Sequence, residues 1–155
     1  MKLSLELNGR QVEWDIAPGE TLLGALRDHR QFSVKRGCET GDCGACTVLL
    51  DGQPVNSCVV AAARCEGGQV VTMEGLLGDP LMQRLQKSMV DSAAIQCGYC
   101  SPGMMMSLYS LLRDKPQAGE DEIRHFLTGN LCRCTGYVKP VAAALAVAQA
   151  QGEQS

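Results

Sequence analysis

The sequence predicts an α+β protein in two parts, a small mixed sheet crossed by one helix and then a bundle of four helices. In the first half apolar and polar residues alternate, which is typical of strands with one buried face. In the second half apolar residues recur every three or four positions, as in amphipathic helices. The segment from Glu74 to Pro80 contains two glycines and a proline. We therefore place the boundary there and predict domains at residues 1–75 and 76–155.

Four strands and one helix are expected in the first domain. The predicted strands are residues 2–8, 12–16, 47–50 and 69–73. Asn8-Gly9 and Asp51-Gly52 are typical of tight turns after the first and third strands. Residues 21–28 read as a short helix whose N-cap is Thr21. A glycine-rich loop over residues 38–46 separates this helix from the third strand.

Four helices are expected in the second domain. They start near Leu81, at Ser101-Pro102, at Glu120 and at Pro140; the third ends at Gly129 and the fourth near Ala150. Leu81, Leu85 and Met89 fall on one face of the first of these helices. The methionines at 104–106 share their helix with leucines at matching spacing, so core packing is favoured over a cofactor site.

Composition excludes several function classes. The chain has 155 residues, of which 45% are hydrophobic and 20% charged, and its formal net charge is −3. An acidic chain with six aromatic residues lacks both the basic field and the stacking platforms that nucleic acids require. No apolar run is long enough to span a bilayer, and no signal peptide is apparent. We expect a cytoplasmic protein that binds neither nucleic acid nor a membrane.

Nine cysteines dominate the chemistry of this chain. An odd number of cysteines without an export signal argues against a disulfide framework, because the cytosol keeps thiols reduced. Clustered cysteines in such a chain more often bind metal. Eight of the nine fall into two groups of four, and the remaining one, Cys65, is expected to be a small buried apolar residue.

The first group has the spacing C-x4-C-x2-C over Cys38, Cys43 and Cys46, followed after eleven residues by Cys58. The first three spacings are those of the plant-type loop that holds a 2Fe–2S cluster. Gly37, Gly41 and Gly44 permit the backbone to approach such a cluster closely, with positive φ values where needed. A structural zinc site is the alternative, although zinc sites usually pair two C-x2-C motifs.

The second group consists of Cys97-x2-Cys100 and Cys132-x-Cys134. The first pair precedes a helix whose N-terminal N–H groups favour thiolate charge, and the second pair follows the next helix. Two helix-terminal loops could therefore close on one metal centre, either iron–sulfur or zinc. A Rieske centre needs two histidine ligands. His29 and His125 lie far from both pairs in sequence and are expected to be ordinary helix residues.

Three segments carry a resemblance to a known family. They are GCETGDCGACT at 37–47, QCGYCSPG at 96–103 and GNLCRCTGY at 129–137. In this order they resemble the small iron–sulfur subunit of molybdenum hydroxylases, the relatives of xanthine dehydrogenase, aldehyde oxidoreductase and carbon monoxide dehydrogenase. The resemblance implies an N-terminal β-grasp, plant-type ferredoxin-like domain followed by an all-α four-helix domain, with one 2Fe–2S cluster in each.

The resemblance also implies a place in an electron-transfer chain. A large molybdopterin-binding subunit would supply electrons to the helical-domain cluster. The ferredoxin-domain cluster would pass them to FAD on a medium subunit, or to another acceptor. Gln96 and Cys134 match residues that contact the molybdopterin cofactor in relatives. This chain would then be one subunit of an oxidoreductase, carrying electrons and having no substrate site of its own.

Two other functions remain open from the sequence. A free-standing two-cluster ferredoxin would diffuse between partners and would lack a large apolar docking face. A zinc-stapled interaction module would carry out no redox chemistry and would be colourless.

Overall fold

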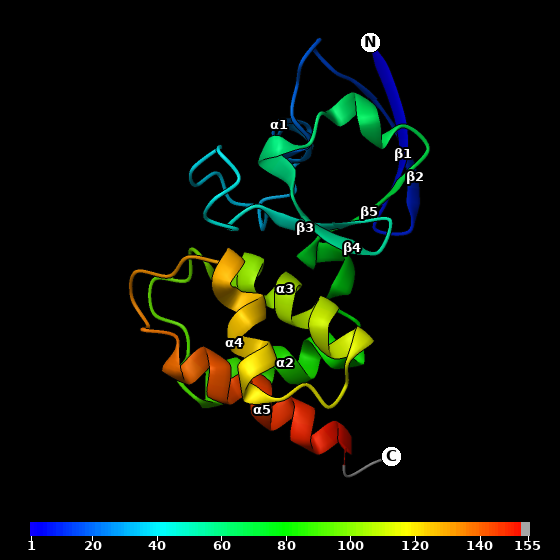
Figure 1. Ribbon diagram of the computed structural model, residues 1–155. Helices are drawn as coiled ribbons and strands as arrows, with labels where there is room; N and C mark the ends of the chain where they lie inside the picture. Colours follow the sequence, from blue (N-terminus) through cyan, green and yellow to red (C-terminus); the bar gives the residue numbers. More distant parts are fainter. Residues whose placement is uncertain (153–155) are drawn as a thin grey trace.

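The computed structural model describes residues 1–152, so residues 153–155 of the predicted second domain lie outside the described part. All five strands lie in the first half of the chain, and four of the five α-helices lie in the second half (Figure 1). The sheet and α1 form one half of the molecule, and α2 to α5 form the other. This is the predicted α+β arrangement of a ferredoxin-like domain followed by a helical domain. Within residues 1–152, no helix is long and apolar enough to cross a membrane.

The sheet has five strands in the order β2-β1-β5-β3-β4. They are β1 (Lys2–Leu7), β2 (Arg10–Asp15), β3 (Thr47–Leu50), β4 (Gln53–Asn56) and β5 (Gln69–Val71). β5 pairs in parallel with β1 and antiparallel with β3, which makes the sheet mixed as predicted. The prediction missed β4. Its sequence QPVN has no apolar alternation, and its proline is tolerated because β4 is an edge strand.

Local turn and cap signals acted as predicted. Asn8 and Gly9 have φ values of 51° and 79°, and Asp51 and Gly52 have 49° and 79°, so both hairpins turn through the left-handed region. The helix α1 (Leu22–Asp28) begins after Thr21, whose hydroxyl accepts a hydrogen bond from the Gly24 amide. These features depend on adjacent residues alone, and this explains why the sequence located them.

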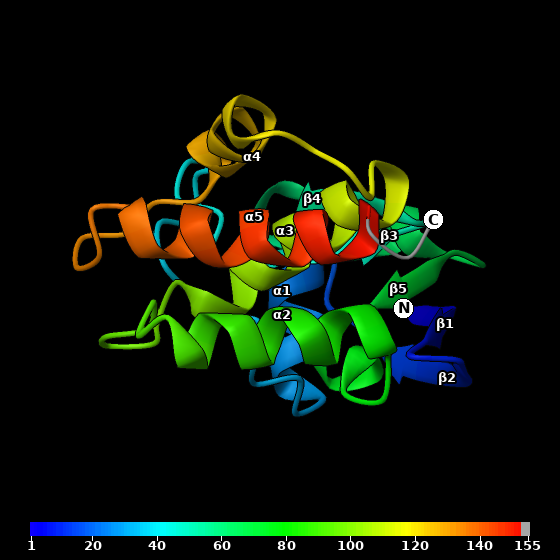
Figure 2. The same ribbon diagram turned by 90° about the horizontal axis from the view of Figure 1, so that it is seen from below.

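Four helices form the second half of the described chain. They are α2 (Pro80–Asp91), α3 (Ser101–Asp114), α4 (Glu120–Phe126) and α5 (Val138–Gly152). The helices α2 and α5 lie side by side (Figure 2). The predicted face of α2 is confirmed: Leu85 and Met89 are buried, and Leu81 is partly buried against the helical core. The prediction did not include Met82, which is also fully buried. The helix α3 starts at Ser101-Pro102, as predicted. The methionines at 104–106 are all buried, as expected of core residues.

The two halves share a boundary at β3. Val48 points into the core between the sheet and α1, whereas Leu49 belongs to the core formed by the helices. Successive residues of a strand face opposite sides of the sheet, so β3 is covered on both faces. α3 packs against it from the helical side. The loop that ends at β3 is therefore held at the junction of the two domains.

The N-cap of α2 gives a first prediction. One carboxylate oxygen of Asp79 accepts hydrogen bonds from the amides of Leu81 (2.8 Å) and Met82 (3.0 Å), and the other accepts one from the Tyr109 hydroxyl (3.1 Å). Asp79→Ala should lower the free energy of unfolding by about 1–2 kcal/mol in chemical denaturation followed by circular dichroism. Asp79→Asn keeps a capping oxygen and should lose less. Equal losses in both variants would contradict the capping role.

Candidate metal centres

The first cysteine group surrounds the loop before β3. The Cys38 sulfur accepts hydrogen bonds from the amides of Thr40 and Cys43, both at 3.4 Å. The hydroxyl and amide of Thr40, together with the Cys43 amide, lower the pKa of Cys38 to about 5. Hydrogen bonds to sulfur stabilise its charged form. Cys38 is therefore a thiolate at neutral pH, the form that ligates metal.

Two glycines leave the space that this loop needs. A Cβ atom at Gly37 would lie 2.6 Å from the Cys43 sulfur, so a side chain there would occupy the space around that sulfur. Gly44 has a φ of +66°, and a Cβ there would lie 2.1 Å from the Gly129 carbonyl oxygen. Positive φ values occur at Gly41 (+86°) and Gly44, as expected, and the close approach of these glycines to a cluster stays a prediction. At Gly44, however, the close neighbour belongs to the helical domain.

Cys46 and Cys58 complete this group from the buried side. They are 2% and 6% exposed, and Cys58 lies in the short helical turn Ser57–Val59 that follows β4. Burial, and then the neighbouring Cys46, raise the pKa of the Cys58 thiol to about 11. The structure thus brings all four predicted cysteines of the first group together, with polar groups directed at Cys38 and apolar surroundings at Cys58.

The second group forms where the loop before α3 meets the loop before α5. Burial alone would raise the pKa of Cys132, but hydrogen bonds from the Thr135 hydroxyl (3.1 Å) and amide (3.5 Å) lower it to about 7. Burial, and then the neighbouring Cys132, raise the pKa of Cys100 to about 12. A hydrogen bond between the side chains of Cys97 and Cys134 raises the pKa of Cys134, and both of these thiols are exposed. The four predicted cysteines of this group are adjacent in pairs.

The two cysteine groups share two features. Each group has one sulfur that accepts hydrogen bonds from a threonine, Cys38 or Cys132, and one thiol with a strongly raised pKa, Cys58 or Cys100. Within residues 1–152, no three side chains of His, Cys, Asp or Glu lie close enough together to hold a single metal ion. A 2Fe–2S cluster makes a different demand, because two ligands bind each of its two irons. Pairs of cysteines flanked by sulfur-directed donors fit that demand.

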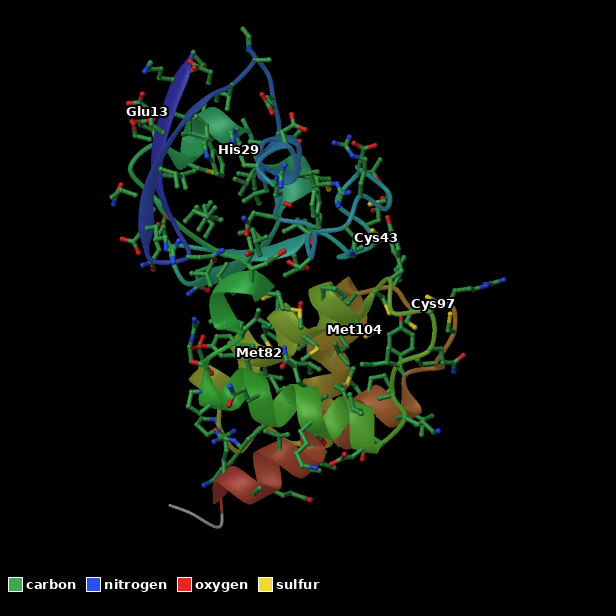
Figure 3. The ribbon with its side chains drawn as sticks, turned by 180° about the vertical axis from the view of Figure 1, so that it is seen from behind. Glu13, His29, Cys43, Met82, Cys97 and Met104 are labelled. Carbon is green, nitrogen blue, oxygen red and sulfur yellow. The ribbon has the colours of Figure 1, made fainter. Side chains whose placement is uncertain are left out.

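Both groups lie on one side of the molecule. Figure 3 shows Cys43 and Cys97 on the same side, near the junction of the two domains. The second group is the more exposed, and large apolar side chains on its two loops and at the start of α5 also face solvent. These are Ile95, Tyr99, Leu131 and Val138. We call these four residues the apolar rim of the second group.

Sequence reasoning missed several polar residues around the cysteines. Thr40 and Thr135 donate to sulfur, and Tyr137 accepts a hydrogen bond from the Cys132 amide at 2.7 Å. All three lie inside the quoted motif segments, and that is the signal that could have identified them. The histidines behave as expected: His29 stacks on Trp14 with ring centroids 4.3 Å apart, and His125 is exposed on α4. Cys65 is 1% exposed, as expected of a buried apolar residue.

Two family models match the chain. Residues 5–72 match the model described as a 2Fe–2S iron–sulfur cluster binding domain, and residues 65–145 match a second 2Fe–2S binding domain. The two matches correspond to the sheet and helical halves. They agree with the iron–sulfur interpretation of both cysteine groups and weigh against zinc.

Similar proteins cover most of the chain. The small FeS subunit of nicotinate dehydrogenase from Eubacterium barkeri is 42% identical over 138 residues, 88% of each chain. The iron–sulfur-binding subunit of xanthine dehydrogenase from Escherichia coli O157:H7 is 43% identical and covers 84% of each chain.

Solved structures have the same fold. A chain of quinoline 2-oxidoreductase from Pseudomonas putida 86 matches with a TM-score of 0.91 and 39% identity, over 99% of this chain and 96% of that one. Aldehyde oxidoreductase from Desulfovibrio gigas matches all of this chain with a TM-score of 0.89 and 34% identity, within 18% of its own length. The same unit thus occurs both as a separate chain and as part of a longer one.

Proposed function

Because this chain belongs to the family of small iron–sulfur subunits of molybdenum hydroxylases, we propose that its two cysteine groups carry electrons from a molybdenum site to a flavin. The chain is the electron-transfer subunit of an oxidoreductase complex with a larger partner. The observation that carries the residue-level proposal is geometric: neighbouring cysteines gather in two places, and in each place a threonine donates a hydrogen bond to one of the sulfurs. Each bound 2Fe–2S cluster supplies a one-electron carrier.

The ligand assignment follows the two groups. Cys38, Cys43, Cys46 and Cys58 are proposed to hold the cluster of the ferredoxin domain, and Cys97, Cys100, Cys132 and Cys134 that of the helical domain. The chain's own residues direct N–H and O–H donors at sulfur in both groups, and they bury two thiols of the first group, Cys46 and Cys58. Such hydrogen bonds and burial set the reduction potential of a cluster.

We propose the direction of transfer from the resemblance to the family, and the exposure of the second group is compatible with it. Gln96, Cys97 and Cys134 are all exposed on the outer side of the second group. We assign Gln96 and Cys134 to contact with the molybdopterin cofactor on the large subunit. The first group would then face an FAD-binding medium subunit or another acceptor. This order places the helical-domain cluster first in the path and the ferredoxin-domain cluster second.

The apolar rim favours a stable complex over a free-standing ferredoxin. A protein that diffuses between partners keeps its surface polar, whereas Tyr99 and Leu131 are 49% and 56% exposed beside the second group. Burial of this rim against the large subunit would remove it from water. A cytoplasmic location is part of the proposal, since ligand cysteines must stay reduced. We also propose residue 75 as the end of the first domain, in the turn Met73–Leu76.

Metal analysis of the native chain tests this function. Two 2Fe–2S clusters predict about four iron ions and about four acid-labile sulfides per chain, with strong visible absorption that bleaches on reduction. Inductively coupled plasma mass spectrometry and sulfide assay give both numbers on one sample. Zinc in place of iron in either half, or a colourless chain with no labile sulfide, would contradict the proposal.

A further inference from the structure

The two cysteine groups are joined by one backbone hydrogen bond. The Leu131 amide donates to the Cys43 carbonyl oxygen at 2.9 Å. Cys43 is a proposed ligand in the first group, and Leu131 immediately precedes Cys132, a proposed ligand in the second. A single hydrogen bond and a short run of covalent bonds therefore connect one ligand set to the other.

A buried asparagine next to this bond crosses between the domains. Asn130 is 2% exposed, and its side-chain amide donates to the Gly44 carbonyl at 3.0 Å, a contact between residues 86 positions apart. The Thr47 hydroxyl donates to the same carbonyl at 2.7 Å. Asn130 precedes Leu131, and Gly44 follows Cys43. The Asn130–Gly44 hydrogen bond therefore lies directly beside the Leu131–Cys43 hydrogen bond and holds the same two chain segments together.

Tyr137 extends this arrangement to the second ligand set. Its hydroxyl donates to the Asn130 carbonyl at 2.9 Å and accepts from the Cys132 amide at 2.7 Å. The position of Asn130 is thus tied to that of Cys132. A continuous series of hydrogen bonds runs from Gly44 through Asn130 and Tyr137 to Cys132.

Another contact between the loops is less protected. The Tyr99 hydroxyl donates to the Arg36 carbonyl at 2.5 Å, which also connects the two cysteine loops. Tyr99 is 49% exposed, so water competes for that bond, whereas Asn130 is almost fully buried. A buried amide that lost its partner would remain unsatisfied, so the Asn130 contact has the stronger hold on geometry.

We propose that Asn130 is a positioning residue for electron transfer between the two clusters. Its buried amide holds the Cys43 carbonyl against the Leu131 amide and so fixes the separation of the two sites. The step moves one electron from the helical-domain site to the ferredoxin-domain site. The first site is oxidised as the second is reduced, and no bond forms or breaks. This inference rests on the ligand sets of the proposed function.

Electron paramagnetic resonance tests the separation directly. When the native protein is fully reduced with dithionite, each 2Fe–2S cluster carries an unpaired electron, and two such centres at a fixed short distance split each other's signals. We expect this splitting in the wild type. In Asn130→Ala we expect loss of the splitting with the iron content unchanged, because the separation is no longer fixed. A splitting as large as in the wild type would overturn the inference, as would its absence from the fully reduced wild type.

Asn56 offers a matched control. Its side-chain amide donates to the Gly41 carbonyl at 2.6 Å, so it makes the same kind of bond to a glycine of the same loop. That bond stays within the ferredoxin domain. Asn56→Ala should therefore keep the wild-type splitting. Equal loss of splitting in Asn56→Ala and Asn130→Ala would assign the effect to loop stability in general and overturn the role of Asn130.

A second measurement needs no variant. Hydrogen exchange in the wild type should show a slow amide at Leu131, although its side chain is 56% exposed, because the amide is bonded to Cys43. Fast exchange at Leu131 would overturn the inference even if Asn130→Ala failed to load iron. Failure of the proposed function is distinguishable, since it would appear as missing iron in the wild type. Intact clusters with unchanged splitting in Asn130→Ala would contradict this inference alone.

Discussion

Replacing Gly44 with alanine is expected to lower the free energy of unfolding by at least about 3 kcal/mol, a large part of the stability of an ordinary domain. Two costs add. Gly44 has a φ of +66°, which a residue with a Cβ adopts at a cost of about 1 kcal/mol. The new Cβ would also lie 2.1 Å from the Gly129 carbonyl and 2.5 Å from the Asn130 side-chain amide, so the two domains would have to separate.

Gly67→Ala is the matched control for this experiment. Gly67 has a similar φ of +69°, but nothing lies within 4 Å of a Cβ built on it. The free energy of unfolding of Gly67→Ala should fall by about 1 kcal/mol, from backbone strain alone. Chemical unfolding of both variants, followed by circular dichroism, gives the difference. Equal losses would show that the close approach of the two domains at Gly44 has no energetic role.

Loss of Cys58 is expected to remove one cluster and leave the other. Cys58 is the proposed ligand from outside the loop at 38–46, and it lies in the turn after β4. Serine is a poor replacement because its hydroxyl does not ionise as a thiol does. Cys58→Ser should lower the iron content from about four to about two per chain and leave the helical-domain cluster detectable by electron paramagnetic resonance.

Cys65→Ser is the control for a buried cysteine. Cys65 is 1% exposed and belongs to the same core as Cys58, and burial raises its pKa. It lies in neither ligand group, so its iron content should equal that of the wild type. Full iron in Cys58→Ser, or loss of iron in Cys65→Ser, would contradict the assignment of ligands in the first group.

Local signals account for most of what the sequence predicted correctly. Turns at Asn8-Gly9 and Asp51-Gly52, the Thr21 cap and the buried methionines at 104–106 all depend on neighbouring residues or on helical spacing. The failures have physical causes as well. β4 carries no alternation because it is a short edge strand, and Met82 was missed because Leu81, its neighbour, also fits the helical period.

The cysteine groups of the candidate site could be predicted from the sequence, whereas the donors to their sulfurs could not. The sequence grouped eight cysteines into two sets, and the structure brings the members of each set together. The sequence did not single out the groups directed at sulfur from nearby, Thr40 and Thr135. The Thr40 amide and the Thr135 hydroxyl could point elsewhere in an open chain, and only the folded loops direct them at Cys38 and Cys132.

By itself, the sequence determined the two-part fold class, the tight turns and the approximate helix starts, because these depend on patterns within a few residues. The tertiary structure alone decided how the two parts meet. In the sequence Gly103 reads as the ordinary start of a helix, yet a Cβ there would lie 2.2 Å from the Gly44 carbonyl. Asn130 reaches that same carbonyl across 86 positions. A close approach between distant segments leaves no periodic pattern in either segment. The contacts of Gly103 and Asn130 with Gly44 are therefore seen only in the folded structure.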